Sequence, residues 1–135
     1  MFYLKDLRMN NNRMHGSTPS ELGNLNVLND LRVGGNDFSG SSIPSEIGNC
    51  GSLQYLGLTF SNLGGTIPPE LFNATSLKWI HLSNNYLEGT IPPTIGKLKS
   101  AQISKSFGIQ LISHENVFTH YLVNLSNTFG YSKNE

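Results

Sequence analysis

The apolar residues of this chain recur at a spacing of roughly 24 residues, and they fit neither a helical period nor a simple alternation. The clearest copy spans residues 77–100, and its apolar residues are Leu77, Ile80, Leu82, Leu87, Ile91, Ile95 and Leu98. The same frame lies over residues 4–27, 28–52 and 53–76. Self-similarity at a fixed period of about 20 to 50 residues is the signature of a solenoid, so we expect four stacked coils.

Each copy predicts the same succession of a strand, a turn and a loop. The strand opens the coil, and its apolar residues face inward while the intervening residues point to the opposite face. Glycine stands where each coil must turn, at Gly16, Gly40, Gly65 and Gly89. Proline follows where strand pairing must stop, because it has no N–H to donate, at Pro19, Pro44, Pro68 and Pro92.

A polar residue follows each strand, at Asn12, Asn36, Ser61 and Asn85. An Asn side chain can bond backbone groups that a bend leaves unpaired, so stacked Asn residues would form a ladder from coil to coil. The third coil departs from this frame twice. Ser61 replaces Asn, and Phe72 replaces the glycine that closes the other coils. We therefore expect the ladder to be weakest there.

The resulting pattern, L-x-x-L-x-L-x-x-N-x-L-x-G-x-I-P-x-x-L-G-x-L-x-x, resembles the plant extracellular type of leucine-rich repeat over residues 4–100. This resemblance implies an α/β repeat solenoid. It would be a right-handed superhelix with a short parallel β-sheet on its concave face and loops or 3-10 turns on its convex side. It also implies an extracellular or plasma-membrane-associated location.

Residues 101–135 leave the repeat frame, because Ala101, Ser104 and Ser106 stand where a fifth coil would need large apolar residues. Residues 109–112 could form a short strand, and the apolar residues of 117–125 fit one face of a helix. The segment is then either a cap over the last coil or irregular, disordered sequence. Both interpretations stay open at this point.

Composition excludes several functional classes. The formal net charge is zero, so no charge imbalance points to nucleic acid or to an anionic membrane. One cysteine, Cys50, allows no internal disulfide, and we expect it to be a small buried hydrophobe. Neither a secretory signal nor a membrane-spanning run is visible. The chain therefore looks like a slice from the middle of a receptor ectodomain.

Nothing in the sequence predicts catalysis or a cofactor. The histidines are His15, His81, His114 and His120, and none has a second ligand at metal-binding spacing. Phosphate-binding loops and kinase signatures are also missing from the sequence. Asn73 and Asn124 begin N-glycosylation sequons, which mark possible sites if the protein is secreted. We predict that the chain is not an enzyme and binds no metal.

The outward residues of the strands form the candidate binding surface on the concave face. The first two coils contribute a charged group, consisting of Asp6, Asp30, Arg8 and Arg32. The last two contribute an aromatic group, consisting of Tyr55, Trp79, Phe60 and His81. Aromatic residues and Arg are frequent interface anchors. Two alternatives remain: Tyr55 and Trp79 could pair across strands for stability, and the charged group could be a solvated face.

The function hypothesis is recognition of a protein or peptide ligand, with a co-receptor as a second possible partner. It follows from the resemblance to plant leucine-rich-repeat receptors, which implies a role in signalling or defence. One rival is an inhibitor of secreted polysaccharide-degrading enzymes, as some members of this repeat type are. The other rival is a truncated structural remnant that has no ligand of its own.

Overall fold

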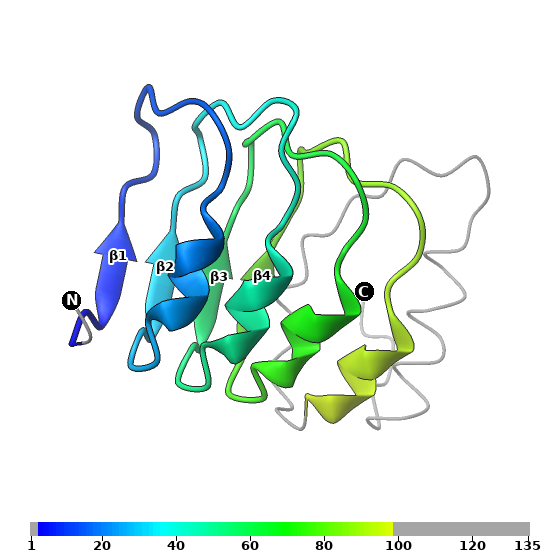
Figure 1. Cartoon of the computed structure of the whole chain (residues 1–135). Coiled ribbons are helices and arrows are strands. Elements are labelled where there is room, and N and C mark those ends of the chain that lie inside the picture. Colours follow the sequence, from blue (N-terminus) through cyan, green and yellow to red (C-terminus); the bar gives the residue numbers. More distant parts are fainter. Residues whose placement is uncertain (1–2, 99–135) are drawn as a thin grey trace, which may run out of the picture.

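The computed structural model describes residues 3–98, which form four coils lying side by side (Figure 1). Each coil contributes one three-residue strand. These are β1 (Asp6–Arg8), β2 (Asp30–Arg32), β3 (Tyr55–Gly57) and β4 (Trp79–His81). Each coil also contributes one 3-10 helix. These are η1 (Ser20–Asn24), η2 (Ser45–Asn49), η3 (Pro69–Asn73) and η4 (Pro93–Lys97). We number the coils one to four by their strands.

The strands form a parallel sheet in the order β1-β2-β3-β4, which confirms the predicted repeat solenoid. The register aligns equivalent positions, so Leu7 lies beside Leu31, Leu31 beside Leu56, and Leu56 beside Ile80. The 3-10 helices lie on the opposite side of the array from the sheet (Figure 1). In the described residues these short helices are the only helical elements.

The 3-10 helices are short because their boundaries are set by the sequence. Proline in extended conformation stands before each one, at Pro19, Pro44, Pro68 and Pro92. After five residues the chain closes with a backbone hydrogen bond, for example from Cys50 N–H to the Ile47 carbonyl at 3.0 Å. The next strand begins soon after this bond, so the connection between proline and strand is too short for an α-helix.

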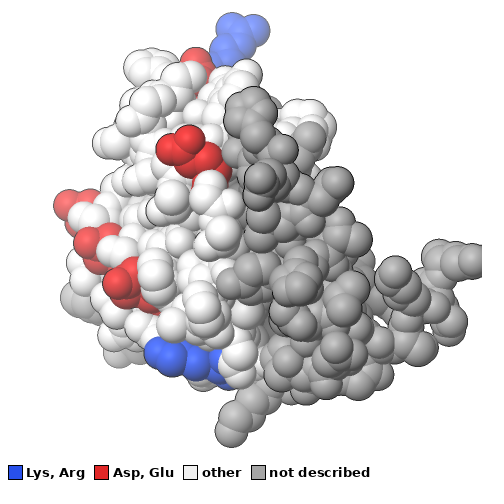
Figure 2. Space-filling model, turned by 90° about the vertical axis from the view of Figure 1, so that its right-hand side faces the viewer, with Lys and Arg blue, Asp and Glu red and all other residues white. Residues whose placement is uncertain are grey.

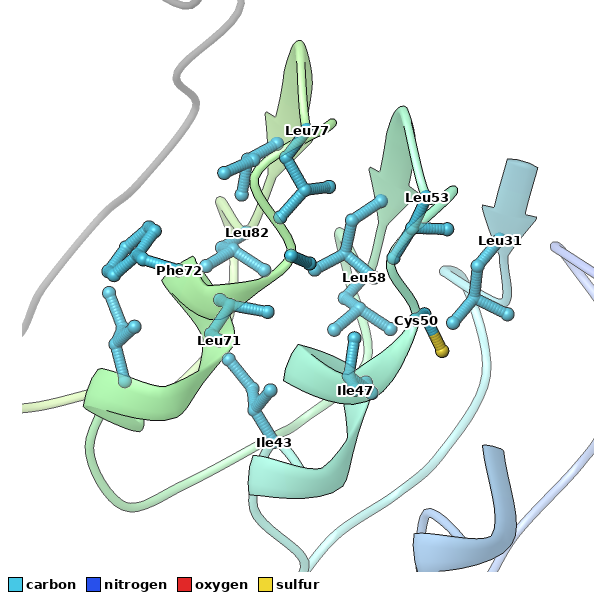
Figure 3. Close-up of a cluster of buried hydrophobic side chains, with 14 of the residues drawn as sticks. Leu31, Ile43, Ile47, Cys50, Leu53, Leu58, Leu71, Phe72, Leu77 and Leu82 are labelled. Atoms are coloured by element: carbon cyan, nitrogen blue, oxygen red, sulfur yellow. The ribbon is translucent and has the colours of Figure 1, made fainter. Parts of the chain in front are cut away.

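The hydrophobic core fills the space between the sheet and the 3-10 helices (Figure 3). Leu53 and Leu58 come from the strand side of coil three, and Ile47 and Leu71 from the helices. All four side chains are buried. Cys50 lies in the same core and donates its thiol to the Leu22 carbonyl at 3.2 Å. Burial raises the pKa of this thiol, so it is the small buried hydrophobe that we expected.

The predicted Asn ladder is present. Asn85 accepts the backbone N–H groups of Ser61 and Leu63 on its Oδ1, at 3.1 and 3.0 Å. Its Nδ2 donates to the carbonyls of Leu58 and Leu82, at 2.7 and 3.0 Å. Thus one buried amide joins coil four to coil three and also closes its own turn. Such a side chain replaces the backbone partners that a bend removes.

Asn36 bridges coils two and one in the same way. Its Oδ1 accepts from the Met14 N–H at 3.1 Å, and its Nδ2 donates to the Met9 carbonyl at 3.0 Å. Ser61, the equivalent residue of coil three, makes one side-chain hydrogen bond in the described structure, a long 3.4 Å contact with the Thr59 carbonyl. No buried amide at the ladder position therefore joins coils three and two, and the side-chain amide that spans this junction is the exposed Asn62, which donates to Asp37 at 3.0 Å. This confirms that the ladder is weakest at Ser61.

Phe72 occupies the position of Gly23 and Gly48 in the other coils. A Cβ at Gly23 would collide with the Glu46 carbonyl, and a Cβ at Gly48 with the Glu70 carbonyl. These glycines therefore permit the close stacking of η1, η2 and η3. Phe72 is itself fully buried, so it is part of the core rather than of the surface. The predictions made for 101–135, including His114, His120 and Asn124, lie outside the described residues.

We predict that Asn85→Ser lowers the free energy of unfolding by about 2–4 kcal/mol, because it leaves buried N–H and carbonyl groups without partners. Urea unfolding followed by circular dichroism measures this change. Asn12→Ser is the matched control, since Asn12 is exposed and its side chain bonds only carbonyls of its own coil. We expect the control to stay within about 0.5 kcal/mol of wild type. Equal losses in the two variants would contradict the ladder's role.

Candidate functional site

The candidate site is the strand face, which we define as the side of the sheet turned away from the 3-10 helices. Alternation along each strand puts Leu7, Leu31, Leu56 and Ile80 into the core and their neighbours on this face. Because the strands are in register, the outward residues form columns. One column contains Asp6, Asp30, Tyr55 and Trp79, and the next contains Arg8, Arg32, Gly57 and His81.

Asp30 is the centre of the charged half. Arg8 approaches its Oδ2 with Nε at 2.9 Å and Nη2 at 2.6 Å, and Arg32 donates Nε to its Oδ1 at 2.8 Å. Only 9% of the Asp30 side chain is exposed, so this is a nearly buried carboxylate shared by two guanidinium groups. Asp6 is more than half exposed and lies 3.7 Å from Arg8. Asp6 therefore contributes little.

The pKa of Asp30 reflects two opposing effects. Burial of the carboxylate raises its pKa, but hydrogen bonds and charges from Arg32 and Arg8 outweigh this effect and lower it below the usual value. Hydrogen bonding to Asp30 in turn raises the pKa of Arg32. Asp30 stays ionised and holds both arginine side chains in place. The charged group is thus an ordered network rather than a set of independent solvated charges.

The charged and aromatic groups, which the sequence suggested as separate zones, are joined. The Arg32 guanidinium lies over the Tyr55 ring, with Cζ 3.9 Å from the centroid. The Tyr55 ring is also stacked with His81, at 5.1 Å between centroids and 23° between planes. Cation–π contacts of this kind contribute about 0.5–1 kcal/mol when exposed. We call Arg8, Asp30, Arg32, Tyr55, His81 and Trp79 the strand-face band.

Gly57 makes room for this arrangement. A Cβ at Gly57 would lie 3.0 Å from Cε1 of Tyr55 and 3.5 Å from Cγ of Arg32. The Tyr55 ring and the Arg32 stem therefore occupy the space that a side chain of β3 would fill. Gly57 was not among the predicted site residues. The signal was a glycine inside a strand, which often marks a close approach by another group.

Trp79 completes the band at β4. Its ring lies 6.4 Å from that of Tyr55 with a tilt of 33°, which is a cross-strand aromatic pair. Lys78 precedes Trp79 in the chain, and its Nζ lies 5.9 Å from the centroid of the Trp79 ring. Trp79 and Tyr55 are both half-buried. The pair therefore joins adjacent strands and also leaves part of both side chains exposed, so a structural role does not exclude a role in binding.

Phe60 is not part of this aromatic cluster, which corrects its grouping with Tyr55, Trp79 and His81. The described ring contacts join Tyr55 to Trp79 and to His81, and none of them includes Phe60. The reason is the backbone: Phe60 has a positive φ of 55°, so the chain turns there and leaves the strand direction. Its side chain is 65% exposed.

Asn73 lies at the end of η3 on the helical side of the array, and it is exposed. Its Oδ1 accepts a hydrogen bond from Lys97 Nζ at 2.6 Å, which leaves Nδ2 free of this contact. Thr75 of the same sequon is also exposed. Among residues 3–98, three or more His, Cys, Asp and Glu side chains never converge as a metal site would require.

We predict that His81 titrates below pH 6.5, the usual pKa for this side chain, because burial lowers its pKa and the charge of Arg32 lowers it further. Arg32→Gln should raise the pKa of His81, and Arg13→Gln, at an exposed arginine outside the band, should leave it unchanged. NMR titration of the imidazole measures both.

The lowered pKa of His81 also makes the stability of the fold depend on pH. The unfolded chain binds this proton at a higher pH than the folded chain does, so folding loses stability as the pH falls below 6.5. The loss stops once the pH is below the folded-state pKa. A folded-state pKa at or above 6.5 would contradict the assignment.

None of the helices in residues 3–98 has the length and apolar composition that a membrane crossing requires.

The family model for the Leucine Rich Repeat matches residues 3–25, 52–74 and 76–98, just over half of the chain. Searching the curated proteins gave no significant match.

Solved structures of plant receptor ectodomains are similar to this chain. The ectodomain of GASSHO1/SCHENGEN3 from Arabidopsis thaliana, in complex with CASPARIAN STRIP INTEGRITY FACTOR 2, is 35% identical with a TM-score of 0.71. The alignment covers 76% of this chain and 12% of that one. HAESA from Arabidopsis, in complex with the peptide hormone IDA and the co-receptor SERK1, is 43% identical with a TM-score of 0.69. There the coverage is 72% and 16%.

A third similar structure is the BIR3–SERK2 complex from Arabidopsis thaliana, with 35% identity, a TM-score of 0.65 and coverage of 70% and 50%. The chain thus spans a small part of the receptor ectodomains and half of this shorter one. The repeat pattern, the parallel sheet, the 3-10 helices and the similar structures all indicate the same family. The chain belongs to the leucine-rich-repeat family, with repeats of the type found in plant receptor ectodomains.

Proposed function

We propose that this chain is a non-catalytic recognition module that binds a peptide or protein on its strand face. One observation carries the proposal: the strand-face band is a continuous network of Arg, Asp and aromatic side chains across all four strands. Coil stacking is provided by the core and by the Asn ladder on the inner side. The outward positions are therefore free to serve recognition.

The band combines strong anchors with low conformational freedom. Arg, Tyr and Trp are the residue types that most often dominate binding energy. In this chain Asp30 holds Arg32, and Arg32 covers the Tyr55 ring. Side chains that are already ordered lose less entropy when a ligand arrives. A peptide lying across the strands would contact polar groups over coils one and two and ring surface over coils three and four.

The similar structures support a peptide ligand. HAESA was solved with the peptide hormone IDA and the co-receptor SERK1, and GASSHO1/SCHENGEN3 was solved with CASPARIAN STRIP INTEGRITY FACTOR 2. By this analogy we propose a peptide as the ligand and a second ectodomain as a possible co-receptor. The shared region is a small part of those receptors, so ligand identity does not transfer.

The same analogy supports an extracellular location and a signalling or defence role for the protein to which these coils belong. Asn73 is then an N-glycosylation site. A glycan there would project from the helical side, opposite the strand face, because Asn73 ends η3. Glycosylation at Asn73 is therefore compatible with ligand binding on the strand-face band.

We predict that Trp79→Ala and Tyr55→Ala each weaken peptide binding at least about tenfold, because each removes an anchor of the band. The probe is a peptide selected from a random display library on the immobilised chain, and isothermal calorimetry gives its Kd. Tyr86→Ala is the matched control, since Tyr86 is an exposed aromatic residue outside the band. It should change Kd by less than about twofold.

The proposal fails if Trp79→Ala and Tyr55→Ala bind the selected peptide as wild type does while their circular dichroism spectra show intact folding. Loss of binding in Tyr86→Ala alone would likewise place the ligand away from the strand face.

A further inference from the structure

Phe60 stands in a backbone conformation that does not suit it. The equivalent positions of the other coils are Asn11, Gly35 and Asn84, with φ values of 57°, 70° and 56°. Phe60 adopts the same left-handed conformation with φ of 55°. Glycine has no Cβ to clash there, and Asn tolerates this region better than most residues. Every coil needs this turn, but only coil three builds it with an aromatic residue.

Folding gains little from this choice. A bulky residue in the left-handed region costs of order 1 kcal/mol or more, and the Phe60 side chain is 65% exposed, so it recovers little by burial. Strained residues that persist in a fold often mark functional positions. Phe60 is thus an exposed ring that is kept against the local backbone preference.

Tyr86 lies on the neighbouring coil and is 62% exposed. The two loops run side by side, because the Phe60 N–H donates to the Ser83 carbonyl at 3.2 Å and the Tyr86 N–H donates to the Leu63 carbonyl at 2.7 Å. Both residues follow the end of a strand, β3 for Phe60 and β4 for Tyr86. We call these two residues the rim patch. Exposed aromatic rings on two neighbouring loops offer apolar surface of the kind that interaction sites use.

The surroundings of the rim patch are acidic. The loops that follow β2, β3 and β4 span residues 33–43, 58–67 and 82–91, and their charged residues are Asp37 and Glu88. Both are exposed. Hydrogen bonds from Ser39 and Asn62 lower the pKa of Asp37, so it stays ionised. Figure 2 shows the end of the array that lies on the right in Figure 1, where Lys and Arg appear at the top and bottom and acidic groups appear between them.

We propose that the rim patch docks a second protein whose contact surface has an apolar pocket flanked by Lys or Arg. The pocket would receive the Phe60 and Tyr86 rings, and the basic side chains would pair with Asp37 and Glu88. Complementary charge of this kind steers association and sets orientation. This surface is distinct from the strand-face band, so the inference does not rest on the proposed peptide ligand.

The first test addresses the strain at Phe60. Phe60→Asn installs the residue that coils one and four use at this turn. We expect its Tm to rise by several degrees, roughly 4 °C or more for a domain of this size. Asn84→Phe is the matched reverse substitution, and we expect its Tm to fall. A lower Tm for Phe60→Asn would show that folding needs the ring, and it would overturn the proposal.

The second test addresses docking with a defined probe. A short synthetic peptide of alternating Leu and Lys is titrated into the isotope-labelled chain, and a Leu-Glu peptide is the charge-reversed control. We expect the Leu-Lys peptide to shift NMR signals of Phe60 and Tyr86, and the Leu-Glu peptide to leave them unchanged. The shifts should disappear in Phe60→Asn and Tyr86→Ser and persist in Trp79→Ala.

Two outcomes would overturn docking at the rim patch. One is that both peptides shift these signals equally. The other is that the Leu-Lys peptide shifts only Glu21, Glu46 and Glu70, the exposed acidic residues of the 3-10 helices, which would indicate unspecific charge attraction. Neither outcome bears on Trp79 and Tyr55, so the strand-face proposal is tested separately.

Discussion

The stacking of one coil on the next is the interaction on which the whole structure depends. A coil of this length has too few apolar side chains to offset the entropy of ordering its own chain, so each coil must bury its face against a neighbour. The gradient of exposure shows this directly. In coil one, Leu4 is 36% and Met9 37% exposed, whereas the equivalent Leu28 and Val33 of coil two are 0% and 4% exposed. The buried amides of Asn36 and Asn85 add polar bridges at two of the three junctions.

Stacking in register also determines what the surface can do. Equivalent residues lie one strand spacing apart, roughly 4.8 Å, so a side chain can reach its neighbours on both adjacent coils. Asp30 uses this spacing to bind Arg8 across the strand boundary and Arg32 along its own strand. Tyr55 uses it to contact Arg32 on one side and His81 on the other. The strand-face band is therefore a product of the repeat, although none of its members is needed for the core.

The repeat frame was enough to predict the stacked coils and the ladder with its weak position at Ser61, and the resemblance to leucine-rich repeats added the parallel sheet. Those features depend on apolar spacing and on residue type, which the sequence displays. The repeat frame also identified all six residues of the strand-face band, because column positions follow from the register. It could not predict that Gly57 would admit the Tyr55 ring, or that Phe60 would turn away. These outcomes depend on side-chain direction and on a positive φ, and neither is visible in a spacing pattern. Tyr86 was missed because it follows the ladder residue rather than a strand position.

The departures from the repeat frame are concentrated in coil three. Ser61 interrupts the ladder, Phe72 replaces a packing glycine, and Phe60 occupies a glycine-type turn. Gly57 makes room in the strand face for the Tyr55 ring. Natural sequences tend to break local rules where function requires it. Coil three is also the coil at which the strand-face band and the rim patch meet, since it holds both Tyr55 and Phe60. The same coil therefore combines the weakest ladder junction with residues of both proposed binding surfaces, as expected if recognition rather than stability selected its residues.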